Sequence, residues 1–233
     1  LQTGKKLATW RSPWVSSPRA KAVNPSWNVS QMPSGAWLQV KVRVKNSKTT
    51  TEWKTVATWR HGLAGGKRTT HSKQADKLAW LDTDTIVAKS GTSFSAWQLR
   101  IDLRRESSKI KSPTLTRAAA SWSTYLSKTA AVSATTMTKK VDLAVPTYSQ
   151  MIHRGHFGQY GGGGEAWCSP TSTSMVLRYF KLGPTASQYA WAKDSNGWVD
   201  HAARYTYDSA YDGTGTWPFN TAYASLYRTD AVV

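Results

Sequence analysis

Cysteine, acidic side chains and long apolar runs are all scarce in this chain of 233 residues. The single cysteine excludes an internal disulfide and any site built from several thiolates, such as a zinc ribbon. There is no run of about 18 apolar residues, so no membrane-spanning helix is predicted. The N-terminus, Leu1 to Gly4, has neither a start methionine nor a secretion signal, and we interpret the chain as a processed or recombinant fragment.

The chain has 13 acidic and 31 basic residues, for a formal net charge of +18, and the two kinds are unevenly distributed along it. Residues 1–140 carry 25 Lys and Arg against 6 Asp and Glu, whereas residues 141–233 carry 6 against 7. Such asymmetry favours two domains. We place them at residues 1–126 and 141–233, with a linker rich in Ser, Thr and Ala at residues 127–140.

The basic half shows the period-two pattern of β-strands. In residues 35–45, four apolar side chains from Leu38 to Val44 alternate with Gln, Lys and Arg, and residues 95–105 repeat the arrangement. Clusters of Gly, Ser, Asn and Pro separate these short strands. The pattern predicts an antiparallel β-sandwich of jelly-roll type for residues 1–126.

The same strands place basic side chains on the faces predicted to meet solvent. One interpretation is a surface that binds an anionic cell-wall or extracellular polymer; the other is that the charges keep edge strands soluble. The residues concerned are Lys41, Arg43, Lys45, Arg100, Arg104 and Arg105. A nucleic-acid partner is not expected, because the sequence has no zinc-finger spacing, no glycine-aromatic strand motif and no basic helix.

The only cysteine, Cys168, lies between four glycines and a helical pattern. Ser169 and Pro170 follow it, and proline is favoured in the first turn of a helix. Apolar residues then recur at helical spacing until Gly183 and Pro184. Cys168 is therefore predicted at or just before a helix N-terminus, where unpaired N–H groups and the helix dipole favour a thiolate. The alternative is a small buried hydrophobe without a chemical role.

The segments Val145 to Gln150 and Trp167 to Ser172, followed by Met175 to Tyr179, resemble the start of the peptidase C39-like family of cysteine peptidases, as found in secreted actinobacterial proteins. Ser169 stands where that family usually has glycine. The tryptophan-rich first half is similar to the domain that precedes the peptidase in that branch. The resemblance implies a partial papain-like α/β domain after the sandwich, hence an α+β chain, and a secreted protein.

On this resemblance Cys168 attacks a carbonyl carbon of a peptide or protein substrate and forms a thioester. Its backbone N–H and the side-chain amide of Gln150 would form the oxyanion hole, with Gln159 as the substitute. Further residues implied to contact the substrate are Gly163, Gly164, Trp167 and Ser169. The family's base histidine and its orienting acid come in a late segment that is absent before Val233. We therefore expect a missing C-terminal segment or chain to supply them, and this fragment alone to be inactive.

Two other functions stay open: an acyltransferase of transglutaminase type that uses the same thioester, and a non-catalytic polymer-binding protein that uses the basic sandwich. His153 and His156 have a spacing that is a weak metal signal, and we predict no metal and no other cofactor. Asp200 and His201 are neighbours on a predicted helix and point in different directions, so the acid cannot orient that ring. Structural roles are expected for these histidines.

Overall fold

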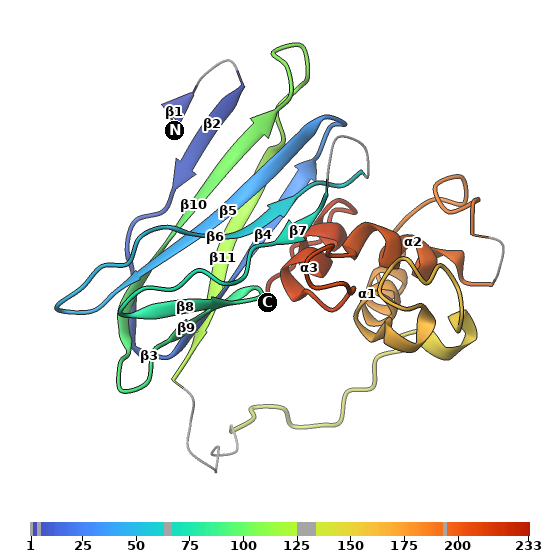
Figure 1. Cartoon of the computed structure of the whole chain (residues 1–233). Coiled ribbons are helices and arrows are strands. Elements are labelled where there is room, and N and C mark those ends of the chain that lie inside the picture. The colour runs from blue at the N-terminus through green and yellow to red at the C-terminus, as the bar shows by residue number, and fades with distance from the viewer. Residues whose placement is uncertain (1, 4–5, 63–66, 125–133, 193–194) are drawn as a thin grey trace.

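The computed structural model describes residues 2–3, 6–62, 67–124, 134–192 and 195–233. Its first half forms two antiparallel sheets, and its second half contains short helices only (Figure 1). The architecture is α+β. Part of the predicted linker, residues 127–133, lies outside the described residues, and residues 134–149 run without helix or strand towards the first short helix.

The larger sheet has the strand order β1-β2-β10-β5-β6-β7, with β3 also paired to β10. Its strands are β1 (Gln2–Thr3), β2 (Leu7–Arg11), β3 (Val15–Ala20), β5 (Ala36–Lys45), β6 (Lys54–Trp59), β7 (Thr69–Thr70) and β10 (Phe94–Arg105). At its centre β5 and β10 pair antiparallel, with Val42 opposite Leu99. Every second residue of β5 is buried, from Ala36 through to Val44. The predicted strand alternation is therefore confirmed.

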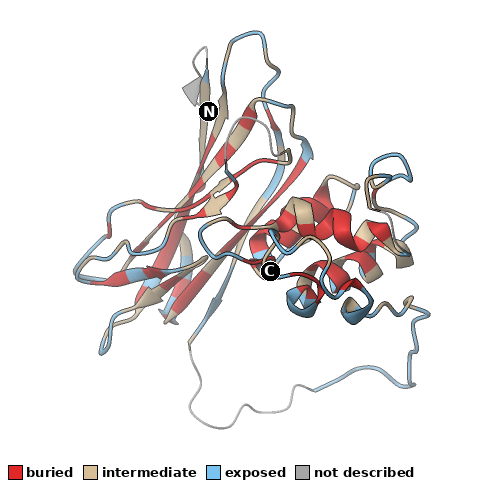
Figure 2. Cartoon of the chain, turned by 45° about the vertical axis from the view of Figure 1, so that its right-hand side comes forward, coloured by how far each residue is buried: buried red, intermediate tan, exposed pale blue. Residues whose placement is uncertain are grey.

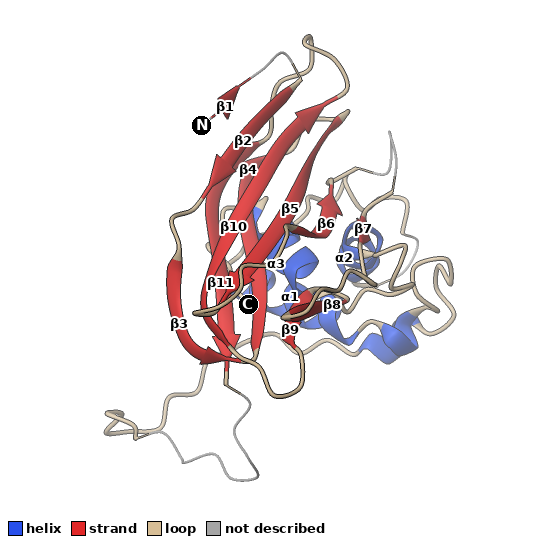
Figure 3. Ribbon diagram, turned by 60° about the vertical axis from the view of Figure 1, so that its left-hand side comes forward, coloured by secondary structure: helices blue, strands red, loops and turns tan. Residues whose placement is uncertain are grey.

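The smaller sheet has the order β11-β4-β9-β8. Its strands are β4 (Ala22–Gln31), β8 (Ala79–Asp82), β9 (Thr85–Ala88) and β11 (Thr114–Ser123). The two sheets face each other across one buried apolar cluster, to which Trp27 of β4, Trp59 of β6 and Ile101 of β10 contribute (Figure 3). The sheets thus form a sandwich, as predicted, because each amphipathic sheet buries its apolar face against the other.

The second half contains two 3₁₀ turns, η1 (Gln150–His153) and η2 (Gly164–Ala166), and the helices α1 (Cys168–Tyr179), α2 (Gly197–Thr206) and α3 (Trp217–Ser225). Pro218 lies in the first turn of α3, where its missing N–H has no intrahelical partner to lose. None of the described helices has the length and apolar character needed to cross a membrane.

Helix α3 belongs to two cores at once. Phe219 and Ala222 are fully buried in the sandwich cluster, and the Phe219 ring meets Trp27 edge-on with centroids 6.1 Å apart. On another face of α3, Tyr223 packs with Leu177 of α1 and Ala202 of α2. The sandwich and the helices are therefore packed through one shared element (Figure 2).

Arg68, just before β7, adds a polar anchor between the two halves. Its Nη2 donates to the Arg204 carbonyl oxygen at 2.7 Å, and its Nε donates to the Tyr207 carbonyl oxygen at 2.9 Å. Both carbonyls lie at the C-terminal end of α2, where a cation complements the helix dipole. Burial lowers the pKa of Arg68 to about 10, which still leaves the guanidinium charged at neutral pH.

Candidate active site

Helix α1 begins at Cys168, and the thiol is exposed. Trp167 is the N-cap residue, but its side chain accepts no hydrogen bond from the first N–H groups of α1. Pro170 lies in the first turn, as the sequence predicted. The lone thiol therefore sits in solvent at the positive end of a helix dipole, which is where an anion is favoured.

Gln150, the first residue of η1, is held beside the chain that enters α1. Its Nε2 donates a 2.7 Å hydrogen bond to the carbonyl oxygen of Glu165, three residues before Cys168. Ser149 fixes the start of η1, because its hydroxyl accepts a 3.2 Å hydrogen bond from the Met151 N–H. Gln159 is exposed in the turn between η1 and η2.

The four glycines at residues 161–164 allow the backbone before α1 to pass close to the backbone of η1. Gly161, Gly162 and Gly163 all have positive φ, which favours glycine. A Cβ on Gly164 would lie 2.4 Å from the His153 carbonyl oxygen and 2.5 Å from that of Gln150. The run therefore has a structural requirement of its own, which is to bring η2 and the start of α1 against η1.

The other predicted substrate contacts have different surroundings. Trp167 is fully buried, and its Nε1 donates to the Tyr160 carbonyl oxygen at 2.8 Å. Gly163 and Gly164 are also buried. Ser169 is half-buried and lines a groove of about 680 Å³ between α1, α3 and residues 228–232.

The apolar stripe of α1 faces this groove. Val176 and Phe180 are 51% and 59% exposed and both line it. The buried face of α1 instead carries Thr171, Ser174 and Leu177, towards α2 and α3. The exposed apolar side chains of Val176 and Phe180 give this side of α1 a surface that another segment or partner could cover.

Asp200 of α2 lies between two histidines, His153 at the end of η1 and His156 in the turn that follows it. Its Oδ2 is 3.1 Å from His153 Nδ1, and its Oδ1 is 3.1 Å from His156 Nδ1. His153 and Asp200 are buried, and His156 is half-buried. The sequence analysis missed this cluster; the three-residue histidine spacing was its one signal, and the third member is 44 residues further along the chain from His156.

His201 points away from Asp200, as its helical position requires, and joins a stack with residues of the sandwich. Its Nδ1 is 2.9 Å from the Tyr223 hydroxyl, and its ring and that of His61 pack on Tyr205 with centroids 4.3 and 4.4 Å away. Burial lowers the pKa of His201 to about 3, helped by the neighbouring His61 and Arg204. Burial also lowers the pKa of His61 to about 4, helped by Arg68.

Three of the six predicted polyanion-binding residues converge on one buried carboxylate. Asp102 of β10 is 3.0 Å from Lys41 Nζ, 2.8 Å from Arg100 Nε and 3.7 Å from Arg104 Nη2. Burial alone would raise the pKa of Asp102, but hydrogen bonds from Arg100, Lys41 and Thr9 outweigh it, and the pKa is lowered. These three cations therefore share a negative charge within the sheet.

The other three have different contacts. Arg43 Cζ lies 5.0 Å from the ring centroid of Trp14 and 4.6 Å from that of Trp53, and Lys45 Nζ lies 4.5 Å from the Trp14 ring. Arg105 Nη1 donates to a carbonyl oxygen in the turn after β10. Arg43 and Lys45 thus form, with two tryptophans, a cation–π cluster on the larger sheet.

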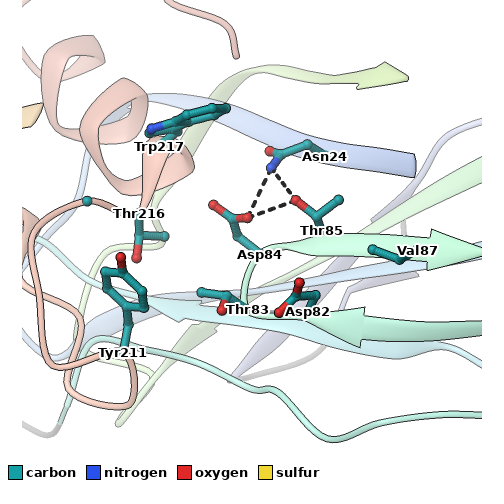
Figure 4. A pocket seen from close by; sticks show the side chains of 10 residues that line it. Asn24, Asp82, Thr83, Asp84, Thr85, Val87, Tyr211, Thr216 and Trp217 are labelled. Atoms are coloured by element: carbon teal, nitrogen blue, oxygen red, sulfur yellow. Dashed lines mark hydrogen bonds between the residues drawn. The ribbon is translucent and has the colours of Figure 1, made fainter. Parts of the chain in front are cut away.

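A second hollow, of about 370 Å³, lies where the turn between β8 and β9 meets α3 (Figure 4). Asp84 Oδ1 accepts hydrogen bonds from Asn24 Nδ2 at 3.1 Å and from Thr85 Oγ1 at 2.9 Å. Burial raises the pKa of Asp84 in spite of these bonds. Exposed Tyr211 and Trp217 are also among its lining residues, none of which lines the groove beside Cys168.

Comparison with protein families assigns both halves of the chain. Residues 2–123 match the model described as the Peptidase C39 N-terminal domain, and residues 142–232 match that of the Peptidase C39 like family. The first match covers the sandwich and more than half of the chain; the second covers η1 to α3. No curated protein and no solved structure matched significantly.

Proposed function

The chain belongs to the peptidase C39 family, and we propose from this that it is a secreted cysteine peptidase in which Cys168 is the nucleophile. The two family matches support a peptidase-type function. The observation that carries the finer proposal is the exposed Cys168 at the first position of α1, with the Gln150 amide bonded to the carbonyl oxygen of Glu165, three residues before Cys168. In this proposal residues 141–233 begin a papain-like domain and the sandwich is of jelly-roll type.

The chemistry follows from these positions. The Cys168 thiolate attacks the carbonyl carbon of a peptide bond, so that a C–S bond forms and the carbonyl oxygen becomes an oxyanion. The Cys168 N–H, one of the first four of the helix, donates to that oxyanion. The Gln150 side-chain amide has two N–H donors. One is bonded to the Glu165 carbonyl oxygen, so the other can donate to the oxyanion. The C–N bond then breaks as the protonated base gives its proton to the leaving amine; water, which loses a proton to the same base, then attacks the thioester and releases the carboxylic acid and the Cys168 thiolate.

The mechanism needs a general base, and each of the five histidines has contacts elsewhere; His61 stacks on Tyr205. His71 is bonded to Thr58, His201 to Tyr223, and His153 and His156 face Asp200. We therefore take the base from a histidine beyond Val233, oriented by an acid, as the family resemblance implies. The apolar groove lined by Ser169 is the surface on which such a segment or chain would pack, because Ser169 is the residue next to Cys168 in α1.

Alkylation by iodoacetamide tests the state of the thiol in the 233-residue chain. At about pH 6 we expect Cys168 to react faster than a cysteine in an unstructured peptide, because the helix N-terminus favours the thiolate. Unfolding in guanidinium chloride should remove the advantage. Cys168→Ala gives the blank. Reaction of the folded chain no faster than the peptide would contradict the proposed nucleophile.

Peptidase activity itself is tested with the naturally secreted protein. We expect it to cleave peptide substrates and to lose this activity in Cys168→Ser. Mass spectrometry of products formed with an added amine separates hydrolysis from acyl transfer, because transfer leaves the amine on the product. Amine adducts that outnumber hydrolysis products would replace the peptidase by an acyltransferase.

A further inference from the structure

We propose that His153, His156 and Asp200 form a binding site for a divalent transition-metal ion, with Zn²⁺ as the preferred ion. One nitrogen from each ring and a carboxylate oxygen lie within 4.8 Å of one another. His153 is the last residue of η1, His156 lies in the turn between η1 and η2, and the aspartate comes from α2. The inference departs from the sequence analysis, which predicted no metal, and does not rest on the proposed peptidase function.

The cluster contains buried polar atoms whose hydrogen-bonding needs are unmet within the described residues. His153 is fully buried, and neither of its ring nitrogens has a hydrogen-bond partner there. Asp200 Oδ2 is likewise buried and without a partner, although it approaches His153 Nδ1 to 3.1 Å. Buried nitrogens and carboxylate oxygens are normally paired, so this close approach without a hydrogen bond needs an explanation. A cation between the two atoms supplies one.

The spacing of the donor atoms fits a small ion. Zinc binds imidazole nitrogen and carboxylate oxygen at about 2.0–2.2 Å, so neighbouring donors of a tetrahedral site are about 3.3 Å apart. His153 Nδ1 lies 3.1 Å from Asp200 Oδ2, and His156 Nδ1 lies 3.1 Å from Oδ1, the other oxygen of the same carboxylate. The His153 and His156 rings are nearly perpendicular, at 87°, with centroids 5.3 Å apart. The donor atoms lie within 4.8 Å of one another, so movements of at most about 1.5 Å would let one nitrogen of each ring and the carboxylate share one ion.

The donor set selects the class of metal. Two imidazoles and one carboxylate suit zinc and other first-row transition metals, whereas magnesium and calcium prefer oxygen ligands throughout. His156 is the half-buried member, so the fourth position would open to solvent on its side and take a water molecule.

The position of the site gives it a structural role. His153 ends η1, whose first residue is Gln150, and its backbone is in tight contact with Gly164. Its ring also lies 6.1 Å, centroid to centroid, from Trp167, the residue before Cys168. An ion shared with Asp200 would therefore fasten the loop that carries Gln150 to α2, without touching the thiol.

The test is zinc binding by the untagged 233-residue chain after removal of metals with a chelator. Native mass spectrometry and calorimetric titration with Zn²⁺ should give one ion per chain, and Mg²⁺ should not bind. His156→Gln and Asp200→Asn should each weaken zinc binding by about tenfold or more. His71→Gln, whose ring bonds Thr58 in the sandwich, and Cys168→Ala should bind zinc as the unchanged chain does.

Two measurements keep the result decisive if the buried aspartate variant does not fold. Zn²⁺ should raise the melting temperature of the unchanged chain but not that of His156→Gln, whose altered side chain is partly in solvent. Co²⁺ in the site should give the visible bands of a nitrogen and oxygen environment, without the thiolate charge-transfer band that Cys168 would add. Absence of a bound ion, or equal loss of zinc in His71→Gln and His156→Gln, would overturn the site.

Discussion

Thr70 of the sandwich donates two hydrogen bonds to Asp208 of the helical half. Its backbone N–H reaches Oδ1 at 3.0 Å and its hydroxyl reaches Oδ2 at 2.7 Å. Thr216, next to α3, donates to the same Oδ2 at 2.9 Å. All three residues are buried. One carboxylate thus joins β7 to the loop between α2 and α3, which makes the contact between the halves specific as well as apolar.

Removal of this carboxylate is expected to destabilise the whole chain. In Asp208→Ala, a buried N–H and two buried hydroxyls lose their acceptor, which should lower the free energy of unfolding by roughly 3–5 kcal/mol. Asp208→Asn should cost less, since the remaining amide oxygen still accepts. Urea denaturation followed by tryptophan fluorescence measures both changes.

Asp212 provides the matched control. It is exposed and accepts a 2.7 Å hydrogen bond from the Tyr207 hydroxyl. Asp212→Asn keeps a side chain that tolerates its positive φ and should change stability by less than about 1 kcal/mol. If Asp208→Ala and Asp212→Asn were equally mild, the buried carboxylate would not be what joins the halves.

Local patterns predicted the elements well. The alternation along β5 is readable because burial of one sheet face repeats every two residues, and the start of α1 is readable because Pro170 favours a first turn. Which side of α1 is buried could not be predicted from the helical pattern. Val176 and Phe180 are exposed while Thr171 is buried, because the partners of this helix are set by distant segments.

Contacts between distant residues could not be obtained from one sequence. Phe219 and Ala222 complete the core of a sandwich whose strands end about a hundred residues earlier. Asp200 meets His153 although 47 residues separate them, and no periodicity connects a loop histidine to a helix carboxylate. The position of Cys168 follows from local signals, whereas its surroundings depend on such long-range packing.

Gly164 should tolerate no side chain. A Cβ there would lie within 2.4 Å of the His153 carbonyl oxygen, so Gly164→Ala forces η1 and η2 apart and should destabilise by about 3 kcal/mol. Gly158→Ala is the matched control, because nothing lies within 4 Å of its added Cβ. Thermal melting of both variants tests this. Similar melting temperatures would mean that η1 and η2 can move apart at little cost in stability.

The buried histidines should make the fold less stable in mild acid. The pKa of His61 is about 4 and that of His201 about 3 in the folded chain, against 6.5 without burial. Below about pH 6.5 the unfolded chain binds more protons than the folded one, so stability falls as the pH falls towards 4. The loss should be on the order of 2 kcal/mol per histidine by about pH 5.

Urea denaturation between about pH 7 and 5 measures this slope. The variants His61→Gln and His201→Gln cannot take up the proton, so each should make stability less dependent on pH, and the double variant least. Above about pH 8 these two rings are almost entirely neutral in both states and should contribute little slope. An unchanged slope in the double variant would assign the acid sensitivity to other groups.

The cation–π cluster of Arg43 and Lys45 offers the sharpest test of the predicted polyanion surface. Lys41, Arg100 and Arg104 share Asp102, so their charge is partly balanced within the protein. Arg43→Gln with Lys45→Gln should therefore weaken binding to an anionic polymer such as heparin and reduce its salt dependence. A control that neutralises exposed Lys109 and Lys111 should have less effect. Equal effects would indicate only general attraction to a chain of net charge +18.

Gln150 should matter for turnover and not for the reactivity of the thiol. Its amide is fixed at the Glu165 carbonyl beside the start of α1, so Gln150→Ala should lower kcat of the proposed peptidase activity by about 10²–10³, with a smaller change in KM. Iodoacetamide should alkylate Cys168 at an unchanged rate, because the helix terminus and not the amide favours the thiolate. Gln159→Ala removes an exposed turn residue and should leave kcat unchanged. A loss of kcat in Gln159→Ala and not in Gln150→Ala would transfer the oxyanion role to Gln159, since only the amide that donates to the oxyanion stabilises the transition state.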